Sequence, residues 1–343
     1  GGGQPCDTGA LGTALVTDVQ EHGGVITHTV SAALPVGQTV EGRIDWARRR
    51  DHMEQHTGEH ILSGTLHRLF GAENVGFHIG FPAVRMDMSV PLTAGQLAEA
   101  EAQANAVIRA DAPVRCWYPA PEDLAKLTYR SKKEIDGAVR LVDAGGADLC
   151  ACCGTHVSTT GQVGAIKILS AQSYKGGTRL AVVCGERAHQ SIAAAWQDAA
   201  AVGTLLSSAP GRLLPAVQNL QAAEAALKQR LAAMQNALSE ALAQAAVPGQ
   251  PAVLHCDGAD GDGLRRICLA VSARTNALTA VLASGGQGLA YTLCLPGGDV
   301  RPVCKALNEA FGGRGGGKPG FCQGSLACTD FADVQNFLVN YHE

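Results

Sequence analysis

Two pairs of potential metal ligands stand out in the sequence, His56 with His60 and Cys152 with His156. The first pair lies in DHMEQHTGEH, which reads as helix, so both imidazoles project from one face about one turn apart. The second pair lies in CACCGTHV, a Cys- and Gly-rich turn whose backbone can bring two side chains to one point. Three ring nitrogens and one thiolate suit tetrahedral zinc, so we expect one Zn²⁺ per chain.

Each spacing taken alone also has an ordinary explanation. Solvated helix faces carry histidines at i, i+4 by chance, and clustered cysteines are often buried thiols. The helical pair is not the H-E-x-x-H of zincins, because residues 56–60 read HTGEH. Cys150 and Cys153 flank Cys152, and either could replace it as ligand or serve as small apolar filler.

Five segments surround and extend these motifs in a fixed order along the chain. They read GGGQPCDTG, RRRDHMEQHTGEHILSGTLHRLFG, GFHIG, CCGTHVSTTGQVGAIKI and FGGRGGGKPGFCQGS. The series resembles the editing module of alanyl-tRNA synthetases and their free-standing relatives, the AlaX-type alanyl-tRNA editing proteins. Because the resemblance covers nearly the whole chain, it points to the long AlaX form. The family pattern C-x-x-x-H selects Cys152 as the fourth ligand.

The resemblance implies a trans-editing, ATP-independent hydrolase that deacylates mischarged tRNA(Ala). A pocket that hydrogen-bonds a hydroxyl can select serine strongly, whereas rejecting one methyl is worth only about 1–3 kcal/mol. We therefore expect Ser-tRNA(Ala) as the better substrate and Gly-tRNA(Ala) as the weaker one. Four protein ligands look like a closed zinc site, so we expect the metal mainly to position the substrate, with Lewis-acid action second.

The resemblance also suggests residues that border the pocket. Gly2, Gly3 and Gln4 belong to a loop whose bare backbone could bring N–H donors to the ester oxygen, which makes them candidate catalytic residues. Asp7 and Thr8 follow in the same loop and are expected to contact the substrate.

Further substrate contacts are expected on strand-like segments. Gly76 and His78 of GFHIG lie where the family reads the amino-acid side chain. His78 could donate to a seryl hydroxyl, or it could be a surface strand residue. Lys167 and Arg179 are candidate phosphate contacts, with a solvated sheet edge as the alternative.

A glycine-rich run near the C-terminus, GGRGGGKPG, nearly matches a phosphate-binding P-loop. Pro319 stands where Ser or Thr must coordinate magnesium, and proline has no backbone N–H for a phosphate. The P-loop is therefore excluded. Instead, we expect a loop in which Arg314 and Lys318 follow an RNA phosphate chain, with a structural turn as the alternative.

The order of expected elements indicates an α+β fold in four parts. These are a partial β-barrel segment at 1–45, a zinc-containing editing domain at 46–187, a helical connector at 188–248 and a DHH-associated α/β domain at 249–343. The chain begins inside a motif that follows an N-terminal strand in the family, so we expect a preceding piece of the barrel. In the editing domain we expect a helix at 48–70 that stops at Gly71, a second helix with Thr93 as its N-cap, and a strand at 163–169. In the last part we expect strands at 252–256, 266–273, 279–285 and 289–295, then a helix at 303–311.

The connector carries apolar residues at alternating three- and four-residue steps, which is the coiled-coil spacing, with Glu224 interrupting one position of the row. They are Val217, Leu220, Leu227, Leu231, Met234 and Leu238. The connector could pack against its own chain or form a homodimer, and the C-terminal domain is a second possible dimer interface.

Composition fits a protein of this kind without identifying it. The 343 residues are 46% hydrophobic and 17% charged, enough for a sizeable core. A net charge of −4 means that RNA would have to bind at local patches. The 12 cysteines show no disulfide framework and no apolar stretch is long enough to span a membrane, so we expect a cytoplasmic protein with reduced thiols.

Two other functions remain open. The first is editing of Ser-tRNA(Thr), because threonyl-tRNA synthetases carry a similar pair of motifs, although they lack the glycine-rich C-terminal domain. The second is a zinc-stabilised RNA-binding or dimerisation protein without catalytic turnover.

Overall fold

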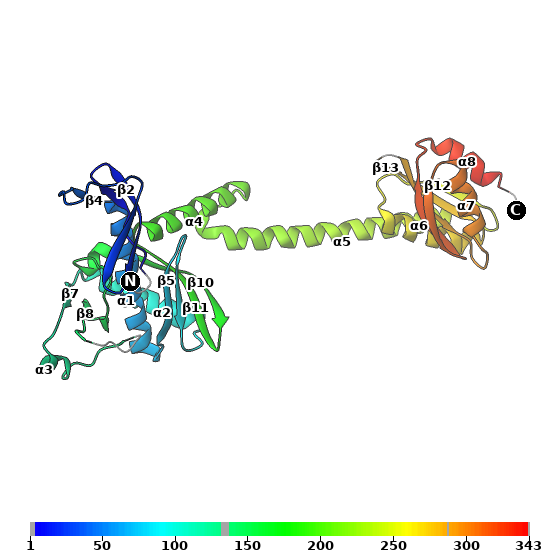
Figure 1. The fold of residues 1–343 in the computed structure, drawn as a ribbon. Helices are drawn as coiled ribbons and strands as arrows, with labels where there is room; N and C mark the ends of the chain where they lie inside the picture. The colour runs from blue at the N-terminus through cyan, green and yellow to red at the C-terminus, as the bar shows by residue number, and fades with distance from the viewer. Residues whose placement is uncertain (1–3, 132–136, 287, 342–343) are drawn as a thin grey trace. The chain divides into compact units, whose positions relative to one another are not determined.

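A computed structural model describes residues 4–131, 137–286 and 288–341. The chain mixes helices with four sheets, which confirms the expected α+β class (Figure 1). It divides into two compact units, Gly1–Leu205 and Leu206–Glu343. The division falls within the segment 188–248, where we expected a helical connector.

The N-terminal strands form an antiparallel sheet in the order β3-β2-β1-β4. Their bounds are Gly9–Leu11 (β1), Ala14–His22 (β2), Val25–Val30 (β3) and Gly42–Ile44 (β4). The order is linear, so the described strands make an open sheet where we expected part of a barrel.

Helix α1, Trp46–Phe70, is the central element of the first unit. It begins where the Asp45 side chain accepts a hydrogen bond from the Arg48 N–H, and it ends at Gly71, whose φ of 64° is left-handed. Residues 54–66 are all buried, so the helix is covered on every side. The predicted helix at 48–70 and its glycine stop are confirmed.

A second antiparallel sheet packs apolar side chains against α1, in the order β10-β11-β6-β5. Its strands are Asn74–Ile79 (β5), Val84–Met88 (β6), Ile166–Tyr174 (β10) and Gly177–Cys184 (β11). Helix α2, Ala94–Arg109, begins with the predicted Thr93 cap. Its Asn105 bonds both the N–H and the carbonyl of Ile166, so α2 protects the edge strand β10.

A third, three-stranded sheet carries the loop with Cys152 and His156. Its order is β7-β8-β9, with bounds Val114–Trp117, Leu141–Ala144 and Leu149–Ala151. The short helix α3 (Pro121–Leu124) lies between β7 and β8 in the sequence, and η1 (Thr160–Val163) follows β9. Helix α4 (Gly185–Leu205) ends the first unit. The expected strand at 163–169 begins only at Ile166, because Thr160–Val163 is 3₁₀ helix.

The second unit has a five-stranded sheet with helices on both faces. The strand order is β12-β13-β14-β16-β15, with β12 and β13 parallel and the other pairs antiparallel. Strand bounds are Ala252–His255 (β12), Thr279–Gly285 (β13), Gly288–Cys294 (β14), Arg314–Lys318 (β15) and Phe321–Leu326 (β16). Helix bounds are Pro210–Arg212 (η2), Leu213–Ala245 (α5), Gly261–Thr275 (α6), Arg301–Ala310 (α7) and Phe331–Val339 (α8). Side chains of α7 and α8 pack on one sheet face, and those of α5 and α6 pack on the other.

Two expectations for the second unit are wrong. Residues 266–273 are not a strand but part of α6, because Leu264, Ile267, Cys268 and Val271 face the sheet at helical spacing. The run RGGGK is not a loop but the edge strand β15, paired with β16 along its whole length. Within the described residues, no helix is both long and apolar enough to cross a membrane.

A glycine on α1 sets how closely the helix approaches the third sheet. A Cβ at Gly64 would overlap the carbonyl oxygen of Ala147 and lie 2.7 Å from the Asp148 Cβ. Gly95, on exposed α2 surface, has no atom within 4 Å of its Cβ position.

We therefore predict that Gly64→Ala destabilises the first unit by about 1–3 kcal/mol, because the turn at Ala147 must move. Urea unfolding followed by tryptophan fluorescence measures this directly, since Trp46, Trp117 and Trp196 all lie in the first unit. The control Gly95→Ala should be neutral or slightly stabilising. Equal stability of the two variants would contradict the close contact.

Candidate metal centre

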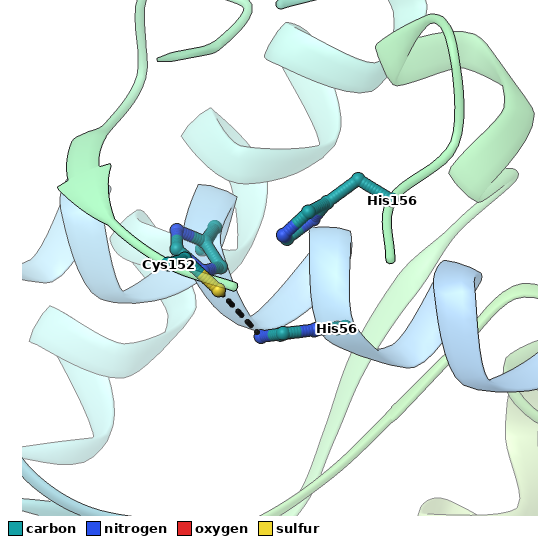
Figure 2. Close-up of side chains that lie close together, drawn as sticks. His56, Cys152 and His156 are labelled. Atoms are coloured by element: carbon teal, nitrogen blue, oxygen red, sulfur yellow. Dashed lines mark hydrogen bonds between the residues drawn. The ribbon is translucent and has the colours of Figure 1, made fainter. Parts of the chain in front are cut away.

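Four side chains that could bind a metal converge at the middle of α1. His56 and His60 come from α1, and Cys152 and His156 come from the loop after β9. Each residue offers one donor atom, and these atoms all lie within 4.8 Å of one another. Figure 2 shows His56, Cys152 and His156 directed at a common centre, with the Cys152 Sγ 3.4 Å from the His56 Nε2.

The donor set fits zinc. A tetrahedral zinc with bonds of about 2.0–2.3 Å has donors about 3.3–3.6 Å apart, close to the measured sulfur–nitrogen distance. The His156 Nε2 is buried and has no hydrogen-bond partner among the described residues, which suits a metal-binding nitrogen. Three imidazoles and a thiolate also match the ligand preference of zinc.

The other ring nitrogen of each histidine lies next to an oxygen acceptor. The Nδ1 of His56 is 2.9 Å from the Gln4 Oε1, that of His60 is 2.8 Å from an Asp148 carboxylate oxygen, and that of His156 is 3.1 Å from the Thr57 Oγ. A proton held on Nδ1 leaves Nε2 with its lone pair facing the centre. These contacts fix the orientation of the three rings, and they are compatible with a proton on each Nδ1.

Asp148 is the buried anion of the site. Its second oxygen accepts a hydrogen bond of 2.8 Å from the Arg130 Nε, and Arg130 also donates to the Ser63 Oγ at 2.7 Å. Burial opposes ionisation, but the hydrogen bonds from His60 and Arg130 hold the pKa of Asp148 below its ordinary value. The carboxylate therefore stays charged beside His60.

Electrostatics differ sharply between two of the histidines. Burial alone would lower the pKa of His60, yet hydrogen bonds with Asp148 and Cys152 raise it to about 10. Burial lowers the pKa of His156 to about 2, and the charge on His60 adds to this effect. The same contact with His60 outweighs burial and lowers the pKa of the Cys152 thiol. In this arrangement the contact with His60 makes the Cys152 thiol easier to deprotonate than an ordinary thiol.

The loop after β9 is held by an arginine and a glycine. The Arg140 Nη1 donates to the carbonyl oxygens of Cys152 and Gly154, at 2.7 and 2.9 Å. A Cβ at Gly154 would overlap the His56 ring, so only glycine allows the loop to approach α1 this closely.

The structure distinguishes the three neighbouring cysteines. Cys152 is grouped with the three histidines, whereas Cys150 is buried near His60 and Asp148, and Cys153 is exposed. We therefore keep Cys152 as the proposed fourth ligand.

The pocket loop has other contacts than we expected. Gly2 and Gly3 lie outside the described residues. The side chain of Gln4 is fully engaged, because its Oε1 also accepts from the Thr155 N–H and its Nε2 donates to the Thr155 Oγ. Gln4 is thus a positioning residue for His56.

A cavity of about 1080 Å³ lies beside this loop. Gln4, Asp7 and Thr8 line it together with residues 153–155, and Asp7 is ion-paired with Arg49. This places Asp7 and Thr8 next to the loop between the proposed ligands Cys152 and His156.

The GFHIG strand presents phenylalanine rather than histidine to the site. Phe77 stacks on the His56 ring with centroids 5.4 Å apart, whereas His78 is exposed on the opposite side of β5. Gly76 packs against Asp87 on the same side as His78. His78 is therefore not brought to the four clustered side chains.

The remaining expected contacts lie elsewhere. Lys167 pairs with Glu101 at 2.7 Å, and Arg179 forms two hydrogen bonds with Asp87 at 2.6 and 2.8 Å. Both cations are thus already neutralised within the first unit. Arg314 and Lys318 belong to the second unit and are exposed on β15.

Sequence reasoning missed four residues that orient the site. Asp148 stands only four positions before Cys152, a spacing that could have drawn attention to it. Thr57 follows His56 directly, but Arg130 and Arg140 carry no local pattern. Their roles arise from long-range contacts that only the fold creates.

Known proteins resemble this chain both around the site and along most of its length. The profile of the threonyl and alanyl tRNA synthetase second additional domain matches residues 139–181, which include Cys152 and His156. The alanyl-tRNA editing proteins Aarsd1-B of Xenopus laevis and Aarsd1 of Mus musculus are 29% and 28% identical. These matches cover 94% and 99% of this chain, and 81% and 85% of the relatives.

The chain is thus similar, over nearly its whole length, to alanyl-tRNA editing proteins. It is also 34% identical to the alanine–tRNA ligase of Pyrobaculum neutrophilum over 94% of its length, but it spans only 38% of that ligase. Among solved structures, the C-Ala domain of Aquifex aeolicus alanyl-tRNA synthetase matches 27% of this chain with 16% identity and a TM-score of 0.25. Similarity at that level supports no structural statement.

A matched pair of cysteine variants tests the proposed ligand set. We predict that Cys152→Ser lowers the zinc content well below one per chain, while Cys153→Ser keeps it, because only Cys152 lies with the three histidines. Zinc is measured by elemental analysis after dialysis. Loss of zinc in Cys153→Ser alone would contradict this assignment.

The carboxylate behind His60 should tune zinc affinity. We predict that Asp148→Asn weakens zinc binding about 10- to 100-fold, because the ring loses its ionised acceptor. Competition with a colorimetric chelator measures the change. Unchanged affinity in a folded Asp148→Asn protein would mean that this contact does not support the site.

Proposed function

We propose that this chain hydrolyses the aminoacyl ester of mischarged tRNA(Ala), and that it does so in trans. The convergence of His56, His60, Cys152 and His156, each histidine held by its own oxygen acceptor, is the observation that carries the proposal. Its relatives in Xenopus laevis and Mus musculus are named alanyl-tRNA editing proteins, which supports the substrate class.

Bound zinc would supply a positive centre that can hold the substrate end and polarise its carbonyl. With four protein donors the centre resembles closed zinc sites, so positioning is the main role that we propose. The aminoacylated end would lie in the cavity beside Gln4 and Thr155. Phe77, stacked on His56, covers one side of the ligand ring and limits water there.

We propose Ser-tRNA(Ala) as the better substrate and Gly-tRNA(Ala) as the weaker one. A hydroxyl can be recognised by a hydrogen bond, whereas the absence of a methyl offers little free energy for discrimination. The exposed His78 is a poor candidate for that hydrogen bond. Polar groups of Asp7 and Thr8, which line the cavity, are better placed.

The direct test is deacylation of a panel of charged tRNAs, with and without a zinc chelator. We predict fastest hydrolysis for Ser-tRNA(Ala), slower hydrolysis for Gly-tRNA(Ala) and little for Ala-tRNA(Ala), with loss of activity when zinc is removed. Preferential cleavage of Ala-tRNA(Ala) would overturn the proposal.

The same panel separates the two alternatives. Ser-tRNA(Thr) belongs in it because the matched profile describes both threonyl and alanyl synthetases. Tight tRNA binding without cleavage of any ester would favour a zinc-stabilised RNA-binding protein.

We also propose that Arg314 and Lys318 contact the tRNA backbone. Both are exposed on the edge strand β15, where alternation places them on one side with Gly316 between them. Such cations bind phosphate without reading sequence.

Homodimerisation through α5 is our further proposal on partners. The apolar side chains at coiled-coil spacing on this helix are 37–69% exposed, so the described part of the second unit does not cover them. A row of exposed leucines of this kind is stabilised by a second copy of the helix.

We predict that Leu231→Glu shifts the protein from dimer toward monomer in sedimentation equilibrium. Gln229→Glu adds the same charge outside the apolar row and should leave the dimer intact. A monomeric wild-type protein, or an unchanged dimer with Leu231→Glu, would contradict the proposal.

A further inference from the structure

A second cavity, of about 990 Å³, lies beside the N-terminal half of α1. Its walls come from α1, the start of α4, the end of β5 and residues 161–164. His52 lines it and stands four residues before the proposed ligand His56, so these two residues are about 6 Å apart along the helix axis. Pockets that bind small ligands usually have volumes of about 300–1,000 Å³, and this cavity is at the upper end of that range.

Arg48 connects this cavity with the one beside Gln4 and Thr155. Arg48 and Pro5 line both cavities. The Arg48 Nε donates to the Cys6 carbonyl at 3.3 Å, and the guanidinium has no ion-pair partner in the described parts of the chain. A guanidinium without an ion-pair partner can bind a phosphate. Because Arg48 lines both cavities, it is well placed to bind the phosphate that joins two nucleosides, one in each cavity.

The two other arginines of the cavity are ion-paired, and Glu186 adds a carboxylate to its lining. Arg50 pairs with Glu54 at 2.8 Å and Arg187 pairs with Asp51 at 2.6 Å, while Glu186 accepts a hydrogen bond from Gln190. The cavity interior therefore suits an uncharged group, such as a base and its ribose, rather than a second phosphate.

The rim offers a surface for stacking. The Phe81 side chain is 90% exposed, and the Arg187 guanidinium lies 5.7 Å from its ring centroid. Arg187 is fixed by Asp51 and by a 2.6 Å hydrogen bond to the Gly80 carbonyl. Exposed aromatic rings and arginine planes are the groups on which proteins stack unpaired RNA bases.

We propose that this cavity binds the nucleotide that precedes the terminal adenosine of the tRNA, with its base on Phe81 and its 3′ phosphate on Arg48. The inference rests on the proposed deacylase function, because that function places the terminal adenosine beside the metal centre. With a nucleotide in this cavity, the single-stranded end of the tRNA would run along α1, which the proposed metal ligands alone do not define.

Two substrates test the proposal, Ser-tRNA(Ala) and 3′-O-seryl-adenosine, which has no preceding nucleotide. Phe81→Ala should lower kcat/KM for Ser-tRNA(Ala) about 5- to 150-fold, the range of one base–aromatic stack, mainly through KM. It should leave hydrolysis of seryl-adenosine unchanged, and Phe81→Tyr should restore tRNA cleavage. Arg48→Ala should show the same substrate dependence.

Matched controls are Tyr118→Ala, which removes another exposed ring, and Arg109→Ala, which removes an exposed cation on α2. Both should behave as wild type. Equal losses on both substrates with Phe81→Ala, or no loss on either, would overturn the proposed nucleotide site.

A binding measurement keeps this test independent of catalysis. Fluorescence anisotropy with an RNA hairpin ending in unpaired CCA should show weaker binding for Phe81→Ala than for wild type, and no difference with a hairpin lacking CCA. If wild-type protein cleaves no ester yet shows this pattern, the deacylase function fails and the nucleotide site stands. If the wild-type protein cleaves the ester, but wild type and Phe81→Ala bind each hairpin equally well, the proposed nucleotide site is wrong and the deacylase function still stands.

Discussion

Three imidazole rings lie in the interior of the first unit, and their polar nitrogens constrain everything around them. A buried polar atom without a partner costs about 1–3 kcal/mol, so each ring needs partners on both sides. On one side these are Gln4, Asp148 and Thr57, drawn from three separate parts of the chain. On the other side the rings face one another and a cysteine sulfur, an arrangement that a metal cation stabilises.

Close approach of backbones makes this arrangement possible. Gly154 brings the cysteine loop against His56, and Gly64 brings α1 against the turn that carries Asp148. Arg130 and Arg140 then fix the two segments, one through a carboxylate and one through backbone carbonyls. The candidate metal centre is therefore a product of the fold of the whole unit rather than of two short motifs.

The sequence could predict the elements whose signals are local. Helix α1 has its cap at Asp45, its stop at Gly71 and two histidines at i, i+4, and all of these follow from spacing and turn chemistry. The α6 segment was misread because a short apolar run fits a strand as well as a buried helix. The roles of Phe77 and Arg130 depend on tertiary contacts, and no local pattern carries that information.

The central claim is that three imidazole nitrogens and one cysteine sulfur form a single metal site. X-ray absorption at the zinc edge of the zinc-loaded protein measures this directly. The account predicts three nitrogen neighbours at about 2.0–2.1 Å and one sulfur at about 2.3 Å. A first shell without sulfur, or with two sulfurs, would contradict it.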